Sequence, residues 1–247
     1  MQLSKENIRE KEFHNNLQSQ KKGRFEDIFY KALFNANEDF FEHLKKSCQD
    51  KLILDYGCGI GNTAEKVSKY NAKSITGIDI SEVSISKAKA FVQEKKINVQ
   101  FKVDNCEESS FENGTFDIVY GAGILHHLKI DKCLNEIHRI LKKEGELVFI
   151  EPLGTNPLIN IYRKFTPSSR SPDEHPLIKS DLNFIREKYD DVRIKYYGFL
   201  TLIFFLFYKS PEKSKIFRIL AKLDQFLFKL NFFKFFAWSI LIIAKKN

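Results

Sequence analysis

Three glycines stand within five residues in the segment LDYGCGIGN, directly after a short apolar run. Glycine lets the backbone take positive φ and approach a ligand closely. The spacing is G-x-G-x-G, so Gly61 comes one residue earlier than the third glycine of the dinucleotide pattern G-x-G-x-x-G, and Asn62 stands in its place. Asp55 precedes the first glycine by two residues. A carboxylate there disfavours a pyrophosphate and favours an ammonium group, so the turn is predicted to hold a nucleoside that lacks phosphate.

Two further segment ends carry polar side chains that suit a nucleoside. Asp79 ends the run GIDI, about 20 residues after the first glycine, a spacing at which an acidic side chain binds ribose hydroxyls. Asp104 and Asn105 end the next apolar run, where a polar pair is able to reach an adenine edge. The pattern therefore predicts one carboxylate for an amine, one for a ribose and a polar pair for a base.

These residues must be positioned by an alternation of strands and helices. Apolar runs rich in β-branched residues alternate with segments of helical periodicity, which is typical of a parallel sheet covered on both faces. Ser81 is expected to cap one of the helices, and Gly145 to end another. We predict strands at residues 51–57, 74–80, 98–105, 116–123 and 146–152, and helices at 62–71, 81–96 and 131–145.

The flanking regions have different patterns. Residues 1–50 read as a helical cap, and residues 51–152 as the α/β core. Residues 153–247 begin with a proline-rich stretch that is expected to be a long, mostly ordered loop or a broken helix. Long loops are usually functional, and this one is expected to cover the acceptor. We expect helices at 25–34, 37–46, 179–189 and 212–230, a strand-like run at 192–207 and a last apolar run at 237–246.

Four linked motifs resemble the class I S-adenosylmethionine-dependent methyltransferases. They are DYGCGIG, GIDIS, FDIVYGAGILHHL and LKKEGELVFIEP, in the expected order over roughly residues 50–152. The resemblance implies an α/β fold with a Rossmann-like, doubly wound sheet of seven strands, the last antiparallel. It also implies N-terminal helices and, between the last two strands, an α-helical insertion. S-adenosyl-L-methionine is the implied cofactor.

The resemblance also assigns the cofactor-binding residues. Asp55 is near the methionine end, Asp79 binds the ribose, and Gly121 lies on the sulfonium side. Asp104 and Asn105 match the segment that contacts adenine. The full predicted set is Asp55, Gly57, Cys58, Gly59, Gly61, Asn62, Asp79, Ile80, Asp104, Asn105 and Gly121.

Methyl transfer requires alignment of the acceptor and a base where the attacking atom carries a proton. The predicted catalytic residues are His127, after the fourth strand, Glu151, at the end of the fifth, and His175, in the proline-rich loop. Each has a plainer interpretation: a histidine that caps a helix, a strand-end ion pair and a surface loop residue. His14 ranks below His175. No metal-ligand spacing is present.

Arg163 and Arg170 lie in the same proline-rich loop. They either hold an anionic group of the acceptor or are solvated. O-methylation is the preferred reaction, because the histidines offer bases for a hydroxyl. The function predicted is S-adenosylmethionine-dependent methyl transfer to a small-molecule acceptor that is apolar or lipid-linked. The alternative is a non-catalytic protein of the same fold, acting as a membrane-surface or partner-binding module.

The C-terminal region is basic and aromatic. Residues 1–152 carry 23 Lys and Arg against 24 Asp and Glu, whereas residues 153–247 carry 17 against 8, and eleven of the 24 phenylalanines fall in the last fifty residues. Residues 212–230 read as a basic amphipathic helix. Its predicted apolar stripe is Ile216, Ile219, Leu220, Leu223, Phe226, Leu227 and Leu230.

Three interpretations of that helix stay open: ordinary packing on its own domain, a lid over an apolar acceptor, and membrane-surface association through residues 212–236. The apolar runs are too short for a transmembrane span. Nucleic acid is not favoured as a partner, because the positive charge is interleaved with apolar residues. The four cysteines and the charged N-terminus favour the cytoplasm, and the sequence leaves the oligomeric state open.

Overall fold

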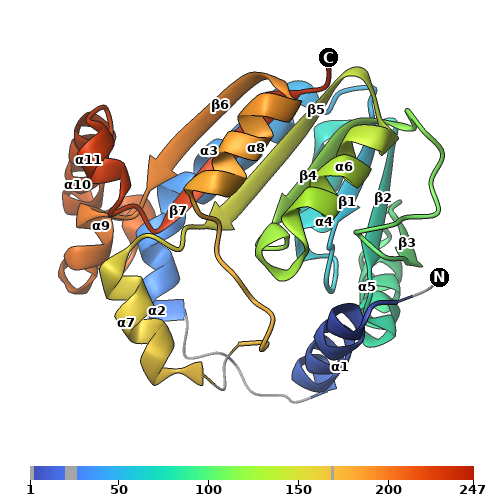
Figure 1. Ribbon diagram of the computed structural model, residues 1–247, viewed down its shortest axis with the longest axis horizontal. Coiled ribbons are helices and arrows are strands. Elements are labelled where there is room, and N and C mark those ends of the chain that lie inside the picture. Colours follow the sequence, from blue (N-terminus) through green and yellow to red (C-terminus); the bar gives the residue numbers. More distant parts are fainter. Residues whose placement is uncertain (1–2, 20–26, 168–169) are drawn as a thin grey trace.

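A single twisted sheet of seven strands forms the centre of the protein (Figure 1). The computed structural model describes residues 3–19, 27–167 and 170–247. The strand order is β3-β2-β1-β4-β5-β7-β6, and β7 pairs antiparallel with both β5 and β6. The strands are β1 (Leu52–Tyr56), β2 (Ser74–Asp79), β3 (Gln100–Val103), β4 (Phe116–Ala122), β5 (Leu141–Pro152), β6 (Asp190–Tyr197) and β7 (Ser239–Lys245). The predicted Rossmann-like sheet with an antiparallel last strand is confirmed.

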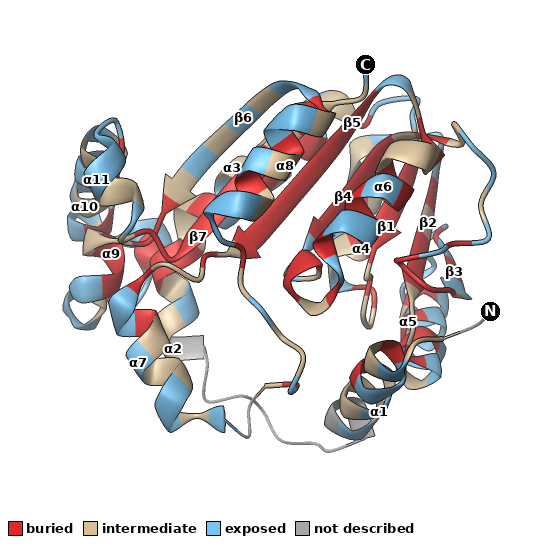
Figure 2. Ribbon diagram, in the orientation of Figure 1, coloured by how far each residue is buried: buried red, intermediate tan, exposed pale blue. Residues whose placement is uncertain are grey.

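Helices cover both faces of the sheet, as the near-continuous apolar strands require (Figure 2). One apolar core lies between the sheet and helices α6 and α8, and the other between the sheet and helices α3, α4 and α5. The helices are α1 (Lys5–Ser19), α2 (Asp27–Tyr30), α3 (Phe34–Ser47), α4 (Asn62–Val67), α5 (Glu82–Lys95), α6 (Ile130–Ile140), α7 (Pro157–Phe165), α8 (Lys179–Lys188), α9 (Leu200–Ile203), α10 (Lys215–Leu227) and α11 (Asn231–Lys234). Ser81 caps α5 as predicted, because its side chain accepts the Ser84 N–H.

Two predicted boundaries are wrong. The helix expected to run to Gly145 ends at Ile140, because the next residue, Leu141, is fully buried and pairs with Phe116 at the start of β5. The strand-like run expected over residues 192–207 ends at Tyr197. Beyond it the backbone turns at Gly198 (φ 80°), and the chain continues as α9.

A buried carboxylate explains that second turn. Asp224, on α10, accepts the backbone N–H groups of Phe199, Leu200 and Thr201 at 3.2, 2.7 and 3.3 Å, which are donors at the start of α9. First-turn N–H groups of a helix have no intrahelical partner, so a carboxylate from another helix satisfies them. The interaction fixes the insertion between β6 and β7 as a helical unit instead of a longer strand.

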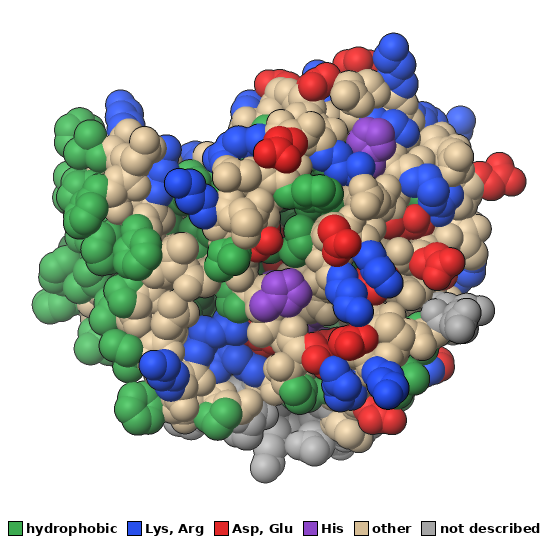
Figure 3. Space-filling view, in the orientation of Figure 1, with side chains coloured by type: hydrophobic (Ala, Val, Ile, Leu, Met, Phe, Trp, Pro, Cys, Tyr) green, Lys and Arg blue, Asp and Glu red, His purple; other side chains and the backbone are tan. Residues whose placement is uncertain are grey.

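Five of the seven residues of the predicted apolar stripe of α10 face solvent, and Leu220 and Leu227 are half-buried. The residues of this segment that face the domain are different ones: Phe217 and Asp224 on α10, and Phe228 just beyond the helix, all less than 6% exposed. The stripe residues on the outer face are between 45% and 64% exposed: Ile216, Ile219, Leu223, Phe226 and Leu230. Hydrophobic side chains gather over α9, α10 and α11, at the left edge of Figure 3. The helix packs on its own domain through Phe217 and Phe228, whereas most of the predicted stripe takes no part in that packing. Among the described residues, no helix is long and apolar enough to cross a membrane.

A polar cluster ties α6 to the loop between β3 and β4. Glu136 is 7% exposed and accepts the Ser109 N–H at 2.9 Å and two Arg139 bonds at 2.6 and 2.8 Å. Arg139 also donates to the carbonyl of Phe111 at 2.7 Å. Burial raises the pKa of Glu136, but the hydrogen bonds from Arg139 and Ser109 outweigh it and hold the pKa below its usual range. The carboxylate form therefore stabilises the fold.

We expect Glu136→Gln to lower the free energy of unfolding by about 1–3 kcal/mol at pH 7, because it weakens several charge-assisted hydrogen bonds. Since the folded-state pKa is depressed, this contribution is complete above the unfolded pKa and is lost as the pH falls through the folded pKa. Urea titrations of wild type and variant at pH 7 and pH 3 measure it. A difference that stays the same at both pH values would contradict the assignment.

Candidate active site

The glycine turn opens into a cavity of about 550 Å³ at the carboxyl ends of β1, β2 and β4. Parallel sheets place their ligand crevice at this edge. All three glycines have positive φ: 73° at Gly57, 52° at Gly59 and 87° at Gly61. A Cβ on Gly59 would meet no atom within 4 Å, so this residue leaves open space for a ligand. The predicted residues that line the cavity are Gly57, Cys58, Gly59, Asn62, Asp79, Ile80 and Asn105.

The other two glycines are required by packing. A Cβ on Gly57 would lie 2.4 Å from Cγ1 of Ile124, and a Cβ on Gly61 would lie 2.9 Å from Cζ of Phe101. The turn is therefore pressed against the segment after β4 on one side and against β3 on the other. Gly61 supports the turn from below and does not line the cavity.

Asp79 fixes the turn to the end of β2. Its Oδ2 accepts the Gly59 N–H and its Oδ1 accepts the Ser81 N–H, both at 2.9 Å. Burial raises the pKa of Asp79, and the two backbone N–H groups oppose that rise. Because a carboxylate has about four acceptor sites, both oxygens keep capacity for hydroxyl groups of a ligand.

Asp55 is buried beneath the turn, 2% exposed, and does not line the cavity. Burial raises its pKa to about 7, the Asp79 carboxylate adds to the rise, and the neighbouring Tyr120 hydroxyl opposes it. Its Oδ2 has no hydrogen-bond partner of good geometry among the described residues. An orphaned carboxylate oxygen next to a ligand turn suits a cationic ligand group.

Two other predicted residues lie behind the cavity wall. Asp104 accepts the backbone N–H groups of Asn105 and Ser110 at 3.0 and 3.1 Å, so it organises the loop after β3. A Cβ on Gly121 would lie 2.6 Å from Cε1 of Phe149, so close packing of β4 on β5 requires this glycine. Neither residue lines the cavity.

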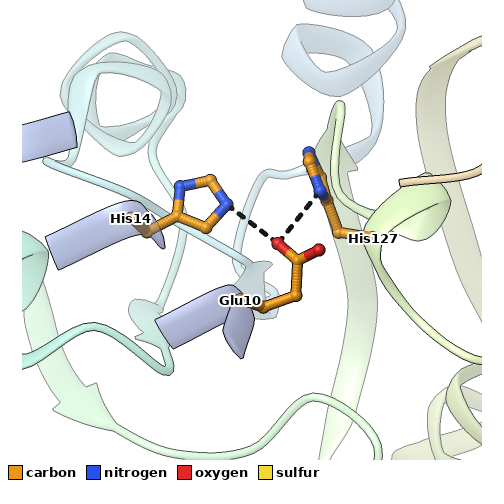
Figure 4. Close-up of side chains that lie close together, drawn as sticks. All are labelled: Glu10, His14 and His127. Atoms are coloured by element: carbon orange, nitrogen blue, oxygen red, sulfur yellow. Dashed lines mark ion pairs between the residues drawn. The ribbon is translucent and has the colours of Figure 1, made fainter. Parts of the chain in front are cut away.

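Helix α1 lies over the cavity. It carries His14, which the sequence ranked below His175, together with Asn7 and Glu10, which the sequence did not reveal. Asn7, Glu10 and His14 line the cavity, and a Glu10 oxygen lies 3.2 Å from Nδ1 of His127 and 3.5 Å from Nε2 of His14 (Figure 4). Burial raises the pKa of Glu10, but the two histidines and Ser171 outweigh it and hold the pKa well below its usual range. The sequence signal that could have indicated these residues is the polarity of α1, because so polar a helix does not pack by apolar contacts alone.

The ligand atoms of Glu10, His14 and His127 all lie within 4.8 Å of one another, as do those of His126, His127 and Glu174. Such groups are able to hold a metal ion, so the absence of metal ligands stays a prediction.

The predicted catalytic residues occupy three different environments. Glu151 is fully buried: Oε1 accepts the N–H groups of Ile124 and Leu125, both at 2.9 Å, and Oε2 lies 2.8 Å from Nδ1 of His126. It therefore shapes the turn after β4. His127 lies on that turn and lines the cavity.

His175 departs from the expected location. It is exposed and lines neither of the cavities described here. Its ring nitrogen Nδ1 lies 3.2 Å from the carbonyl oxygen of Asp173, and its backbone N–H donates to the carbonyl of His126 at 2.8 Å. The backbone hydrogen bond to His126 holds the loop in place, and the imidazole ring of His175 faces solvent.

A second cavity, of about 750 Å³, adjoins the first. Both are lined by His14, Ala122, Gly123 and His127. The second cavity is mostly apolar and aromatic, and it lies between α7, α9, the end of β5 and the start of β7. Side chains that give it this character include Phe13, Phe29, Tyr30, Leu202, Phe205 and Trp238. Its polar residues include Arg163, Arg170 and Glu174, whose ion pair links α7 to the loop that follows it.

Comparison with known proteins identifies the core. Residues 53–145 match the family model described as a methyltransferase domain. A Bacillus subtilis uncharacterized methyltransferase, YcgJ, is 33% identical over 101 residues, 40% of this chain and 40% of that protein. A ubiquinone biosynthesis O-methyltransferase from Colwellia psychrerythraea is 32% identical over 111 residues, 44% of this chain and 45% of that protein. The core belongs to the class I S-adenosylmethionine-dependent methyltransferase family.

The fold extends the likeness to the whole chain. A geranyl diphosphate C-methyltransferase from Streptomyces coelicolor, solved with Mg²⁺, geranyl diphosphate and S-adenosyl-L-homocysteine, superimposes with a TM-score of 0.65. The match covers 99% of this chain and 98% of that one, and because only 14% of residues are identical it shows the fold alone. The methyltransferase core is thus shared, whereas this chain spans less than half the length of the two curated relatives it matches.

We expect Asp55→Asn to make the methyltransferase domain more stable at pH 8, by roughly 1–4 kcal/mol. Because the native state keeps a proton that the unfolded state releases, wild-type stability falls as the pH rises from about 4 to about 7. Asparagine has no such proton, so the gap between variant and wild type should grow over this range. Denaturant titrations at pH 4, 6 and 8 measure it. An asparagine variant that is less stable at pH 8 would contradict the proposed burial cost.

Proposed function

We propose that this protein transfers a methyl group from S-adenosyl-L-methionine to an apolar small molecule bound in the second cavity. The observation that carries the proposal is the junction of the two cavities at His14, Ala122, Gly123 and His127. One cavity has the glycine turn and carboxylates that suit a nucleoside with a cationic end. The other has an apolar interior, as small-molecule sites usually do.

The residues of the first cavity fit the cofactor. The open space at Gly59 leaves room for the cofactor beside the turn, and Asp79 has unused acceptor sites for the ribose hydroxyls. Asn105 lines the cavity where the adenine edge is expected. The orphaned oxygen of Asp55, buried beneath the glycine turn, favours a ligand whose nearby end is positively charged. Ala122 and Gly123 line both cavities, so the methyl group would have to pass beside them to reach an acceptor in the second cavity.

The cofactor, when bound, supplies a methyl carbon on a positively charged sulfur. A lone pair on the acceptor forms the new bond to that carbon as the carbon–sulfur bond breaks, and the bonding pair stays on sulfur. What the protein adds is alignment of the two cavities and a group to take a proton. Burial lowers the pKa of His127, so its ring is neutral at pH 7 and able to accept a proton from an acceptor hydroxyl. We therefore favour O-methylation, with His127 as the base and Glu10 holding its ring.

We also propose that the protein associates peripherally with anionic membranes through residues 212–236. The outer face of α10 is apolar, and residues 209–236 carry seven Lys or Arg against two acidic residues, of which Asp224 is buried. Exposed apolar side chains ringed by positive charge suit a lipid surface with anionic headgroups. The unpaired cysteines suit the reducing cytoplasm.

A labelling experiment tests methyl transfer. Purified protein is incubated with cofactor carrying a deuterated methyl group and an extract of the producing cells, and the organic and aqueous phases are analysed by mass spectrometry. We expect label in an organic-phase small molecule, and a loss of about 10²–10⁴ in rate for His127→Asn if the ring removes a proton. Calorimetric titration with the cofactor controls for binding. A protein that binds no cofactor would support the non-catalytic alternative.

Vesicle sedimentation tests the membrane surface. Each Lys near an anionic bilayer contributes about 1 kcal/mol, so reversing Lys215, Lys222 and Lys229 together to Glu should weaken binding by more than 100-fold. The matched control reverses three exposed lysines elsewhere, Lys45, Lys89 and Lys132, which leaves the net charge equal. Equal loss in both triple variants would point to net charge alone, and a wild type that never sediments would refute the surface.

A further inference from the structure

Two arginines share one carboxylate inside the second cavity. Glu174 Oε1 lies 2.7 Å from Nη2 of Arg163 and 3.6 Å from Nε of Arg170. The three side chains are only 17%, 18% and 10% exposed, in the order Arg163, Arg170, Glu174. Two guanidinium groups held by a single carboxylate leave one positive charge without a counterion at this point. An unbalanced charge costs free energy where little water can reach it, and a bound anion would remove that cost.

The remaining acidic side chain in the cavity does not fill that role. Glu151 lines the cavity, but its oxygens are occupied by the turn after β4 and by His126. Arg170 is held in place by its own donors, because Nη1 donates to the carbonyl and hydroxyl oxygens of Thr166 at 2.9 and 2.8 Å. Burial lowers the pKa of Arg163, which marks the cost of keeping its charge there.

The arginine pair lies at the inner end of the cavity. A Glu174 oxygen is within 4.8 Å of ring nitrogens of His126 and His127, and His127 also lines the first cavity. Part of the apolar wall reaches the surface: Leu158 and Ile203 line the cavity and are 51% and 43% exposed. A ligand with one charged end and an apolar body therefore suits this cavity, with its charged end at the arginine pair.

We propose that Arg163 and Arg170 bind the anionic head, a carboxylate or a phosphate, of an amphiphilic acceptor whose apolar body fills the second cavity. The planar guanidinium matches both anions through paired N–H donors. This inference rests on the proposed function and narrows its acceptor to anionic amphiphiles. It also places the methylated atom in or beside the polar head.

The single tryptophan provides a direct readout, since Trp238 is 7% exposed and lines this cavity. Its fluorescence is followed while wild type is titrated with decanoate, decyl phosphate and 1-decanol. We expect at least one of the two anions to bind ten-fold or more tightly than the alcohol. The tighter anion indicates whether the natural head is a carboxylate or a phosphate. Equal affinity for all three, or no binding, would overturn the proposal.

Variants separate an anion site from a structural ion pair. Arg163→Gln and Arg170→Gln should each bring the anion affinity to within about three-fold of the alcohol, while Arg186→Gln, at an exposed position of α8, should change nothing. Glu174→Gln removes the competing carboxylate and should tighten anion binding several-fold. A structural ion pair would instead show a lower melting temperature for Glu174→Gln and no gain in anion affinity, which would overturn the proposal.

Cofactor binding is measured separately by calorimetry. If wild type binds no S-adenosylmethionine, methyl transfer is refuted, whereas the fluorescence titrations still decide whether the arginine pair is an anion site.

Discussion

The buried carboxylate of Glu151 is the constraint on which the site depends. It ends β5 and holds the turn after β4 by accepting the backbone N–H groups of Ile124 and Leu125. Ile124 packs against Gly57, so the same turn determines how closely the glycine loop approaches β4. It also carries His127 to the wall that the two cavities share. One strand-end carboxylate thus positions parts of both binding sites.

Polar contacts join α1 to the rest of the site. Arg9 makes two hydrogen bonds of 2.7 and 2.8 Å to Asp173, and Glu10 reaches His127 and Ser171. The Arg9–Asp173 contact is exposed to water and contributes little, whereas Glu10 and Ser171 are buried, so their hydrogen bond fixes α1 over the cavity more firmly.

The C-terminal insertion reverses the usual orientation of an amphipathic helix. Phe217, Asp224 and Phe228 face the domain, while the more regular apolar stripe faces outward. Asp224 is committed to the start of α9, so rotating α10 to bury the stripe would break those hydrogen bonds. The second cavity has exposed apolar residues of its own, since Leu158 and Ile203 line it and are 51% and 43% exposed.

The sequence alone determined the alternation of core strands and helices and the glycine turn, because these follow from local periodicity and from motifs that lie close together along the chain. The seven-stranded sheet followed from the family resemblance, and its strand order came only from the structure. It also named His127, Arg163 and Arg170. Only the tertiary structure decided which side chains meet: Glu10 contacts His127 across more than a hundred residues, and Asp55, Asp104 and Gly121 support the cavity from behind. Periodicity showed that α10 is amphipathic, but which face turns inward depended on Asp224 and its partners on α9. Such long-range contacts leave no local signal, since they arise only when distant segments pack.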